Sequence, residues 1–189
     1  MAHRIITINR MYGSGGRLLG KALAEKLGIG FYDKELIRLA SEKNQIPYKE
    51  LEKVDEKKAS QWRLPVKEQM QMEPQYHFHP MNDVLFETQS QVIQELAQKE
   101  DCIIVGRCAN YVLGDKCFSL FVYAPFEYRV QSIMERLGRE EKSARALVKK
   151  MDKTDEKWKD LSNYQMCIDT SRFDQEFLLK LLADVYAAL

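Results

Sequence analysis

The stretch Arg4-Ile5-Ile6-Thr7-Ile8-Asn9-Arg10-Met11-Tyr12-Gly13-Ser14-Gly15-Gly16-Arg17 decides the fold of this chain. Its β-branched start predicts a strand over Arg4–Ile8, and the pattern of residues 18–27, after the glycines, predicts a helix. Glycines allow a tight turn whose backbone N–H groups can approach an anion, and a helix N-terminus adds a favourable dipole. The stretch therefore predicts an anion-binding loop made of Gly13, Ser14, Gly15 and Gly16. A tight strand-to-helix connection without a ligand is the alternative.

The loop departs from the phosphate-binding motif Gly-x-x-x-x-Gly-Lys-[Ser/Thr]. If Gly15 is the second glycine of the motif, Arg10 stands at the first. The lysine position then holds Gly16, and the hydroxyl position holds Arg17. Arg10 and Arg17 bracket the turn with positive charge that folding does not need, which favours a bound anion. Lys21, one helical turn further on, is an additional cation that we expect on the phosphates of a nucleotide.

Length and composition limit the class of protein. A chain of 189 residues fits one domain with a substantial core. Its 29 basic and 28 acidic residues leave a net charge of +1, which gives no sign of a nucleic-acid or membrane partner. No apolar run approaches the roughly 20 residues needed to cross a bilayer, and the start of the chain has no signal-peptide pattern. We therefore expect a cytoplasmic protein.

The four cysteines lack the Cys-x-x-Cys spacing of metal and redox sites, and most of them lie in apolar runs. They predict reduced core residues rather than disulfides or zinc ligands; they are Cys102, Cys108, Cys117 and Cys167.

Short apolar runs alternate with helical patterns along the chain. Strands are predicted over residues 4–8, 30–32, 102–105, 119–123 and 165–168. Their nearly continuous Val, Ile, Leu and Phe is typical of parallel strands buried on both faces. Helices are expected over residues 34–44, 47–58, 126–137 and 143–151, from about 82, and at the end of the chain. This alternation predicts an α/β domain with right-handed βαβ units and a doubly wound sheet.

Residues 59–80 break this rhythm, because they have no clean period and three prolines interrupt them. We interpret them as an insertion or flap over the site, which a partner subunit in a homodimer could order. His77 and His79 form a His-x-His pair, but no third ligand lies nearby in the sequence, and a metal site needs three or four donors. We therefore predict no metal site there.

A second group of residues follows the strand predicted over Cys102–Val105. Gly106 and Arg107 come directly after it. In an open parallel sheet, ligands bind outside the carboxyl ends of the strands, at the switch point between neighbours. If this strand lies beside the first, Arg107 emerges near the glycine loop, and its planar fork suits a phosphate. Pairing of Arg107 with a carboxylate of the protein is the alternative.

With these landmarks in order, the chain resembles the cytidylate kinase-like branch of the nucleoside monophosphate kinases over nearly its whole length. The landmarks are the loop stretch, Gly30-Phe31-Tyr32-Asp33-Lys34-Glu35, Val105-Gly106-Arg107-Cys108-Ala109-Asn110-Tyr111 and Asp169-Thr170-Ser171. The resemblance implies one three-layer P-loop kinase fold over residues 1–189, with a five-stranded parallel sheet of order 2-3-1-4-5 and helices on both faces. It also implies ATP and Mg²⁺, and transfer of the γ-phosphoryl group to a small nucleotide such as CMP or dCMP.

The resemblance also assigns roles to single residues. Arg107 matches the family arginine that contacts the acceptor phosphate, and Asp33 matches the acid that approaches the acceptor or the metal. Arg129 resembles the arginine near the donor nucleotide, with a solvated helix face as the alternative. Arg17, at the start of the helix, is the expected substitute for the phosphate-loop lysine, because Lys21 lies a full turn further on. Arg17, Asp33 and Arg107 are therefore the expected catalytic residues.

The chain departs from the family pattern at further positions. No Ser or Thr stands at the magnesium position, and Cys108 replaces an acid. The lid region, at about residues 150–160, is short, and no arginine lies between Arg145 and Arg172. Lid closure excludes water and completes the charge clamp in such enzymes. The leading expectation is a kinase; the alternatives are a non-catalytic nucleotide- or phosphate-binding protein on a kinase fold, and a kinase for a non-nucleotide acceptor.

Overall fold

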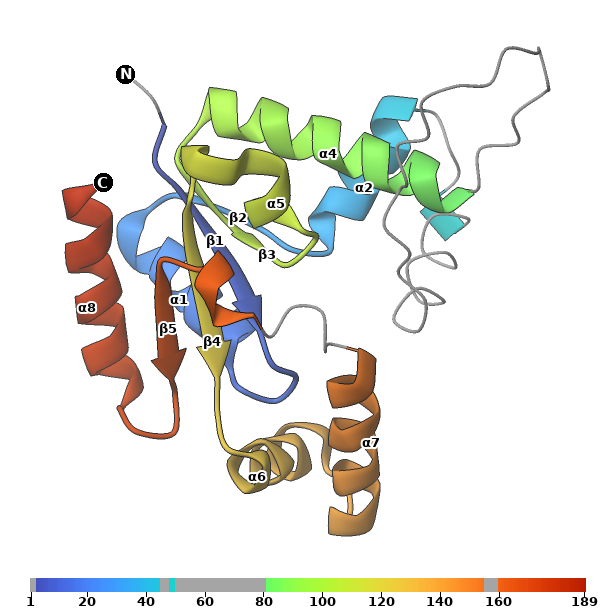
Figure 1. The fold of residues 1–189 in the computed structure, drawn as a ribbon, viewed down its shortest axis with the longest axis vertical. Helices are drawn as coiled ribbons and strands as arrows, with labels where there is room; N and C mark the ends of the chain where they lie inside the picture. Colours follow the sequence, from blue (N-terminus) through green and yellow to red (C-terminus); the bar gives the residue numbers. More distant parts are fainter. Residues whose placement is uncertain (1–2, 45–47, 50–80, 155–159) are drawn as a thin grey trace. The chain divides into compact units, whose positions relative to one another are not determined.

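The computed structural model describes residues 3–44, 48–49, 81–154 and 160–189. The chain divides into two compact units, one of residues 1–33 and 93–189 and the other of residues 34–92. The first unit contains all five strands of the described chain, which are β1 (Ile5–Arg10), β2 (Gly30–Tyr32), β3 (Cys102–Val105), β4 (Phe118–Tyr123) and β5 (Met166–Asp169). They pair in parallel in the order β2-β3-β1-β4-β5 (Figure 1). The predicted strand order is confirmed.

Helices follow the strands as the sequence pattern predicts. They are α1 (Gly16–Leu27), α2 (Glu35–Asn44), α4 (Met81–Lys99), α5 (Ala109–Leu113), α6 (Phe126–Leu137), α7 (Glu141–Thr154) and α8 (Gln175–Ala188), with short 3-10 turns η1 (Gly114–Lys116) and η3 (Leu161–Asn163). The flap expected at 59–80 lies outside the described residues. So do most of the helix expected over 47–58 and residues 155–159 of the expected lid.

Helices cover both faces of the sheet. Since successive side chains of a strand point to opposite faces, neighbouring residues of β1 contact different helices. On one face, Ile6 and Ile8 of β1 form a core cluster with Leu19 and Leu23 of α1 and with Leu178 of α8. On the other face, the Asn9 amide donates to the Asn110 side chain of α5 over 2.9 Å. Each fully buried aliphatic side chain contributes about 1.5–3 kcal/mol by leaving water. This burial explains why the strands are almost continuously apolar.

The second unit, residues 34–92, has a small core of its own. Ile37 and Ala40 of α2 pack with Leu85 of α4 in one buried cluster. Ile37 and Ala40 are three residues apart, so they lie on one face of α2.

Three of the four cysteines lie in the core as predicted. All four are free thiols; Cys102, Cys108 and Cys117 are buried, whereas Cys167 is half-buried. Burial, with smaller effects from Glu100 and Asp101, raises the pKa of Cys102 to about 12, so its thiol stays protonated and unreactive at neutral pH. None of the helices in the described ranges combines the length and the apolar character needed to cross a membrane.

Asp101, just before β3, connects the N-terminal residues 3–4 and the C-terminal helix α8 to the sheet. Its carboxylate accepts hydrogen bonds from the Tyr186 hydroxyl of α8 (2.5 Å) and from the Arg4 backbone N–H (3.0 Å), and His3 lies 3.1 Å away. The Tyr186 bond is the main cause that lowers the pKa of Asp101 below its ordinary value, followed by the Arg4 and His3 contacts.

This depressed pKa predicts an acid-sensitive contribution to stability. Because the folded state lowers the pKa of Asp101, its contribution is fully present above the ordinary aspartate pKa of about 3.9 and is lost as the pH falls through the folded value. Asp101→Asn should therefore be less stable than wild type at pH 7, with a difference that shrinks toward pH 2. Urea unfolding of both proteins between pH 7 and pH 2 measures this, and a constant difference would contradict it.

Candidate active site

The glycine loop joins β1 to α1 and has glycine where its geometry leaves no alternative. Gly13 and Gly15 have φ values of 87° and 80°, in the left-handed region that side chains disfavour. A Cβ on Gly13 would lie 3.0 Å from both the Cβ and the carbonyl oxygen of Arg129, at the start of α6. Gly15 is the N-cap of α1 and makes no side-chain capping bond to the helix. The N–H groups of the first turn of α1 are thus available to an anion.

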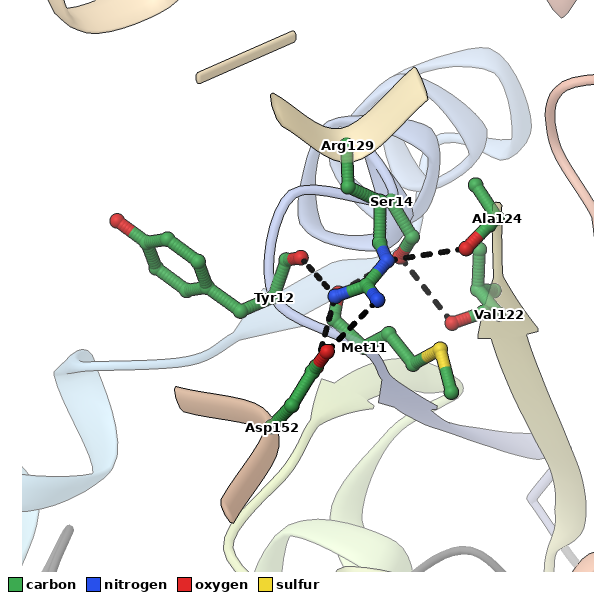
Figure 2. Close-up of polar contacts among 7 residues, drawn as sticks. All are labelled: Met11, Tyr12, Ser14, Val122, Ala124, Arg129 and Asp152. Atoms are coloured by element: carbon green, nitrogen blue, oxygen red, sulfur yellow. Dashed lines mark hydrogen bonds and ion pairs between the residues drawn. The ribbon is translucent and has the colours of Figure 1, made fainter. Parts of the chain in front are cut away.

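Hydrogen bonds to β4 and to Thr170 after β5 fix the path of the loop. Figure 2 shows the bond between Ser14 and Val122 of β4. The Met11 N–H donates to the Val122 carbonyl over 2.9 Å, and the Ser14 hydroxyl lies 2.9 Å from the Met11 carbonyl and 3.1 Å from that of Val122. The Thr170 hydroxyl lies 2.7 Å from the Ser14 carbonyl. The buried Ser14 side chain therefore supports the loop from within, and the Ser14 N–H donates to the Met11 carbonyl over 3.2 Å, so both groups of Ser14 are used inside the protein.

The Thr170 contact predicts a measurable effect on the loop. Thr170→Val keeps the shape of the side chain but leaves the Ser14 carbonyl without this donor, which should cost about 1–3 kcal/mol. Urea unfolding measures the loss, and ATP titration should show weaker binding because the loop is less ordered. Ser171→Ala is the matched control, since its hydroxyl bonds Asp169 within the same turn and not the loop. Equal losses in both variants would contradict a role in the loop.

Arg129 lies beneath the loop, with only 4% of its surface exposed. Its Nε donates to the Ala124 carbonyl over 2.9 Å and its Nη1 to the Tyr12 carbonyl over 3.2 Å. Two further bonds of 2.7 and 2.8 Å join the guanidinium to both carboxylate oxygens of Asp152 in α7 (Figure 2). The structure thus places Arg129 where it ties α6, α7 and the loop together. Its expected contact with the donor nucleotide stays a prediction.

Arg17 and Asp33, two of the predicted catalytic residues, lie together. The Arg17 Nε donates to Asp33 Oδ2 over 2.5 Å; the Asp33 side chain is 5% exposed and that of Arg17 47%. Lys21 faces solvent further along α1 and lies 3.7 Å from Glu25, its neighbour one turn on. The first turn of α1 thus presents a paired arginine, while Lys21 belongs to the outer surface of the helix.

Arg10 is the last residue of β1, and Arg107 lies two residues beyond the end of the neighbouring strand β3. The Gly106 N–H donates to the Ile8 carbonyl over 2.9 Å, which continues the pairing of the two strands. A Cβ on Gly106 would lie 2.3 Å from Nη1 of Arg10, so the Arg10 guanidinium lies directly on this glycine. The expectation that the turn after β3 emerges beside the first strand and its loop is consistent with this arrangement.

The turn after β3 carries backbone strain. Arg107 and Cys108 have φ values of 59° and 54°, the two positive values among the described residues other than glycine. Such residues cost of order 1–3 kcal/mol each and cluster at functional sites. The turn after β3 therefore holds Arg107 in a backbone conformation that L-residues disfavour.

The residues present fit the phosphates of ATP better than they fit a metal held by the protein. Gly15 has open space where a Cβ would be, which leaves room for phosphate oxygens against the loop, and Arg10 and Arg17 flank it. The hydroxyl position of the motif holds the cation Arg17, and within the described ranges no three His, Cys, Asp or Glu residues are placed to hold a metal. Mg²⁺ often keeps several waters and binds mainly through substrate phosphates and one or two carboxylates. We expect Asp33 to be the carboxylate that approaches this Mg²⁺.

A parallel sheet of order β2-β3-β1-β4-β5 with a glycine loop after β1 is the fold of the P-loop kinases. The sequence model of the cytidylate kinase-like family matches residues 5–172, so the chain belongs to that family.

Solved structures share the fold along the whole chain. An uncharacterized protein from Eubacterium ventriosum ATCC 27560 is 26% identical, with a TM-score of 0.69, over 99% of this chain and 100% of that chain. A shikimate kinase from Bacteroides thetaiotaomicron is 14% identical (TM-score 0.59; 96% and 97% covered), as is a gluconokinase from Sinorhizobium meliloti 1021 (TM-score 0.59; 99% and 93%). At 14% identity these two kinases show the fold alone. None of the curated proteins matches the sequence.

Proposed function

We propose that this protein transfers the γ-phosphoryl group of ATP to a small phosphorylated acceptor, a nucleoside monophosphate such as CMP or dCMP. One observation carries the proposal: Arg10, at the end of β1, lies on Gly106 at the end of β3, so the glycine loop and the Arg107 turn share one edge of the sheet. A donor phosphate on the loop and an acceptor phosphate on Arg107 would therefore face each other across the switch point of the sheet.

The chain's own residues supply positioning and charge. The N–H groups of Gly13, Gly15 and Gly16 in the loop would hold the donor phosphates, since that of Ser14 donates to the Met11 carbonyl. The Arg107 fork would bind the acceptor phosphate through two hydrogen bonds. The paired Arg17 and Asp33 would orient the acceptor at the mouth of the loop. ATP with its Mg²⁺ supplies the phosphoryl group. Such transfer depends on alignment and on stabilising the charge that spreads over the transferred oxygens.

Two other functions are favoured by particular observations. A phosphate-binding protein without turnover is favoured by Gly16 and Arg17, which stand where the motif has its lysine and its magnesium hydroxyl. A kinase for a non-nucleotide acceptor is compatible with the fold shared with a shikimate kinase and a gluconokinase, because fold does not determine the substrate.

An acceptor panel distinguishes these functions. The purified protein is incubated with ATP and Mg²⁺, and transfer to CMP, dCMP, UMP, AMP, shikimate or gluconate is measured directly. We expect transfer to a nucleoside monophosphate, lost in Arg107→Ala and retained in Arg136→Ala, a control on the exposed surface of α6. ATP binding without transfer to any acceptor would favour the non-catalytic protein. Transfer to shikimate or gluconate alone would overturn the nucleotide acceptor.

A further inference from the structure

Residues 10 and 16 face each other across the start of the loop. A Cβ placed on Gly16 would lie 2.8 Å from the Cβ of Arg10 and 3.0 Å from that of Val122 in β4. Real Cβ atoms essentially never approach within 3.0 Å, so residue 16 must remain glycine while residue 10 carries a side chain. In the motif, glycine stands at the first of these positions and lysine at the second. This chain has the reverse order, with the long cation at position 10.

The Arg10 side chain runs from this point toward the end of β3. Its Nη1 lies 2.3 Å from where a Cβ on Gly106 would be, so glycine at 106 makes room for the guanidinium. Gly106 is buried and has a φ of 73°. Two glycines thus accommodate Arg10, Gly16 against its Cβ and Gly106 against its guanidinium. The charge lies at the carboxyl ends of β1 and β3, where ligands bind in sheets of this kind.

The other cations beside the loop are less suited to the donor phosphates. The Arg17 side chain is 47% exposed, beside the buried Asp33 carboxylate. Lys21 is 57% exposed and pairs with Glu25 on the surface of α1. Exposed cations act on a ligand through water and are screened by salt.

We infer that Arg10 supplies the positive charge that the lysine supplies in the phosphate-binding motif, so that glycine and cation have exchanged places within the loop. The inference rests on the proposed binding of ATP and names the residue that neutralises its phosphates. A guanidinium presents a planar fork of donors, whereas a lysine presents a point charge. Arg10 therefore holds two phosphate oxygens at once.

The first experiment measures affinities for ATP and AMP by titration calorimetry, without any phosphoryl transfer. Arg10→Gln should lower ATP affinity at least about tenfold, the loss of one charged hydrogen bond or more, and should change AMP affinity much less. Arg17→Gln should lower ATP affinity less than about threefold, as for an exposed cation. Lys26→Gln, in the last turn of α1, is the charge-matched control. Thermal unfolding of each variant verifies that it is folded.

The second experiment exchanges the two positions. Gly16→Lys alone should lose ATP binding, because its Cβ overlaps that of Arg10. Arg10→Gly combined with Gly16→Lys restores the first glycine and the lysine of the motif and should bind ATP at least about tenfold more tightly than Arg10→Gly alone. The contact with Val122 remains at 3.0 Å, so recovery should be incomplete. Arg10→Gly with Gly16→Ala has the same Cβ without the charge and should show no recovery.

The outcomes separate this inference from the proposed function. A loss of ATP affinity in Arg17→Gln equal to or greater than that in Arg10→Gln would overturn the role of Arg10. If the double variant does not fold, this comparison of the two single variants is the test. A wild-type protein that binds ATP through Arg10 but phosphorylates no acceptor supports the inference and overturns the proposed transfer. A wild-type protein that does not bind ATP overturns both.

Discussion

Removing the carboxylate of Asp152 should lower the free energy of unfolding by about 3–5 kcal/mol. Asp152→Ala leaves the Arg129 guanidinium, which is 4% exposed, without the partner that accepts two of its hydrogen bonds. A buried charge that loses its partner cannot regain its hydration, so the cost exceeds the strength of the pair itself. Urea unfolding at pH 7 measures the change. Because Arg129 also bonds the Tyr12 carbonyl, the variant should bind ATP more weakly as well.

The same two helices contain a matched control. Glu127 of α6 accepts two hydrogen bonds from Arg145 of α7, of 2.7 and 2.6 Å, but both side chains are exposed. Glu127→Ala removes the same kind of contact where water can replace it, so its effect on unfolding should be much smaller. Similar losses in Glu127→Ala and Asp152→Ala would show that burial is not the cause. Asp152→Asn, which keeps one acceptor but loses the charge, should lie between Asp152→Ala and wild type.

The fold was largely readable from the sequence because its signals are local. Short runs of Val, Ile, Leu and Phe separated by helical patterns allow few arrangements other than a parallel sheet covered on both faces. The strand β3 begins and ends where the pattern places it, whereas β1 begins one residue later and ends two residues later than predicted. The strand order came from the resemblance and not from the pattern, since alternation alone does not fix which strands are neighbours.

The site was readable only in part, because its contacts join residues far apart in the sequence. Asp152 lies in a charged run in which nothing distinguishes it from its neighbours. Yet its carboxylate accepts a hydrogen bond from Arg129, 23 residues away in the sequence. The pairing of Arg17 with Asp33 likewise depends on where β2 ends. The reversed order of Arg10 and Gly16 was visible as a departure from the motif, but its steric cause needs the position of the Arg10 Cβ.

Substitutions of Arg107 can separate an effect on stability from an effect on acceptor binding. Its φ of 59° lies in the left-handed region, which costs an L-residue roughly 1–2 kcal/mol and costs glycine nothing. Glycine in turn adds about 0.4–1 kcal/mol of unfolded-state entropy. Arg107→Gly should therefore leave the free energy of unfolding within about 1 kcal/mol of wild type. Arg107→Ala, which keeps a Cβ at this φ, should be less stable than Arg107→Gly.

Acceptor binding should respond in the opposite way, because both variants lose the guanidinium that we propose for the acceptor phosphate. Loss of a bidentate, charge-assisted contact costs about 2–5 kcal/mol, so CMP affinity should fall roughly 30-fold or more in Arg107→Gly and in Arg107→Ala. Arg107→Lys should lose nearly as much, because a point charge does not reproduce the fork. Calorimetric titration with CMP measures the affinity, and urea unfolding measures stability on the same preparations. Unchanged CMP affinity in Arg107→Lys would remove the bidentate role, and a loss of affinity that followed the loss of stability across the three variants would make Arg107 a structural residue.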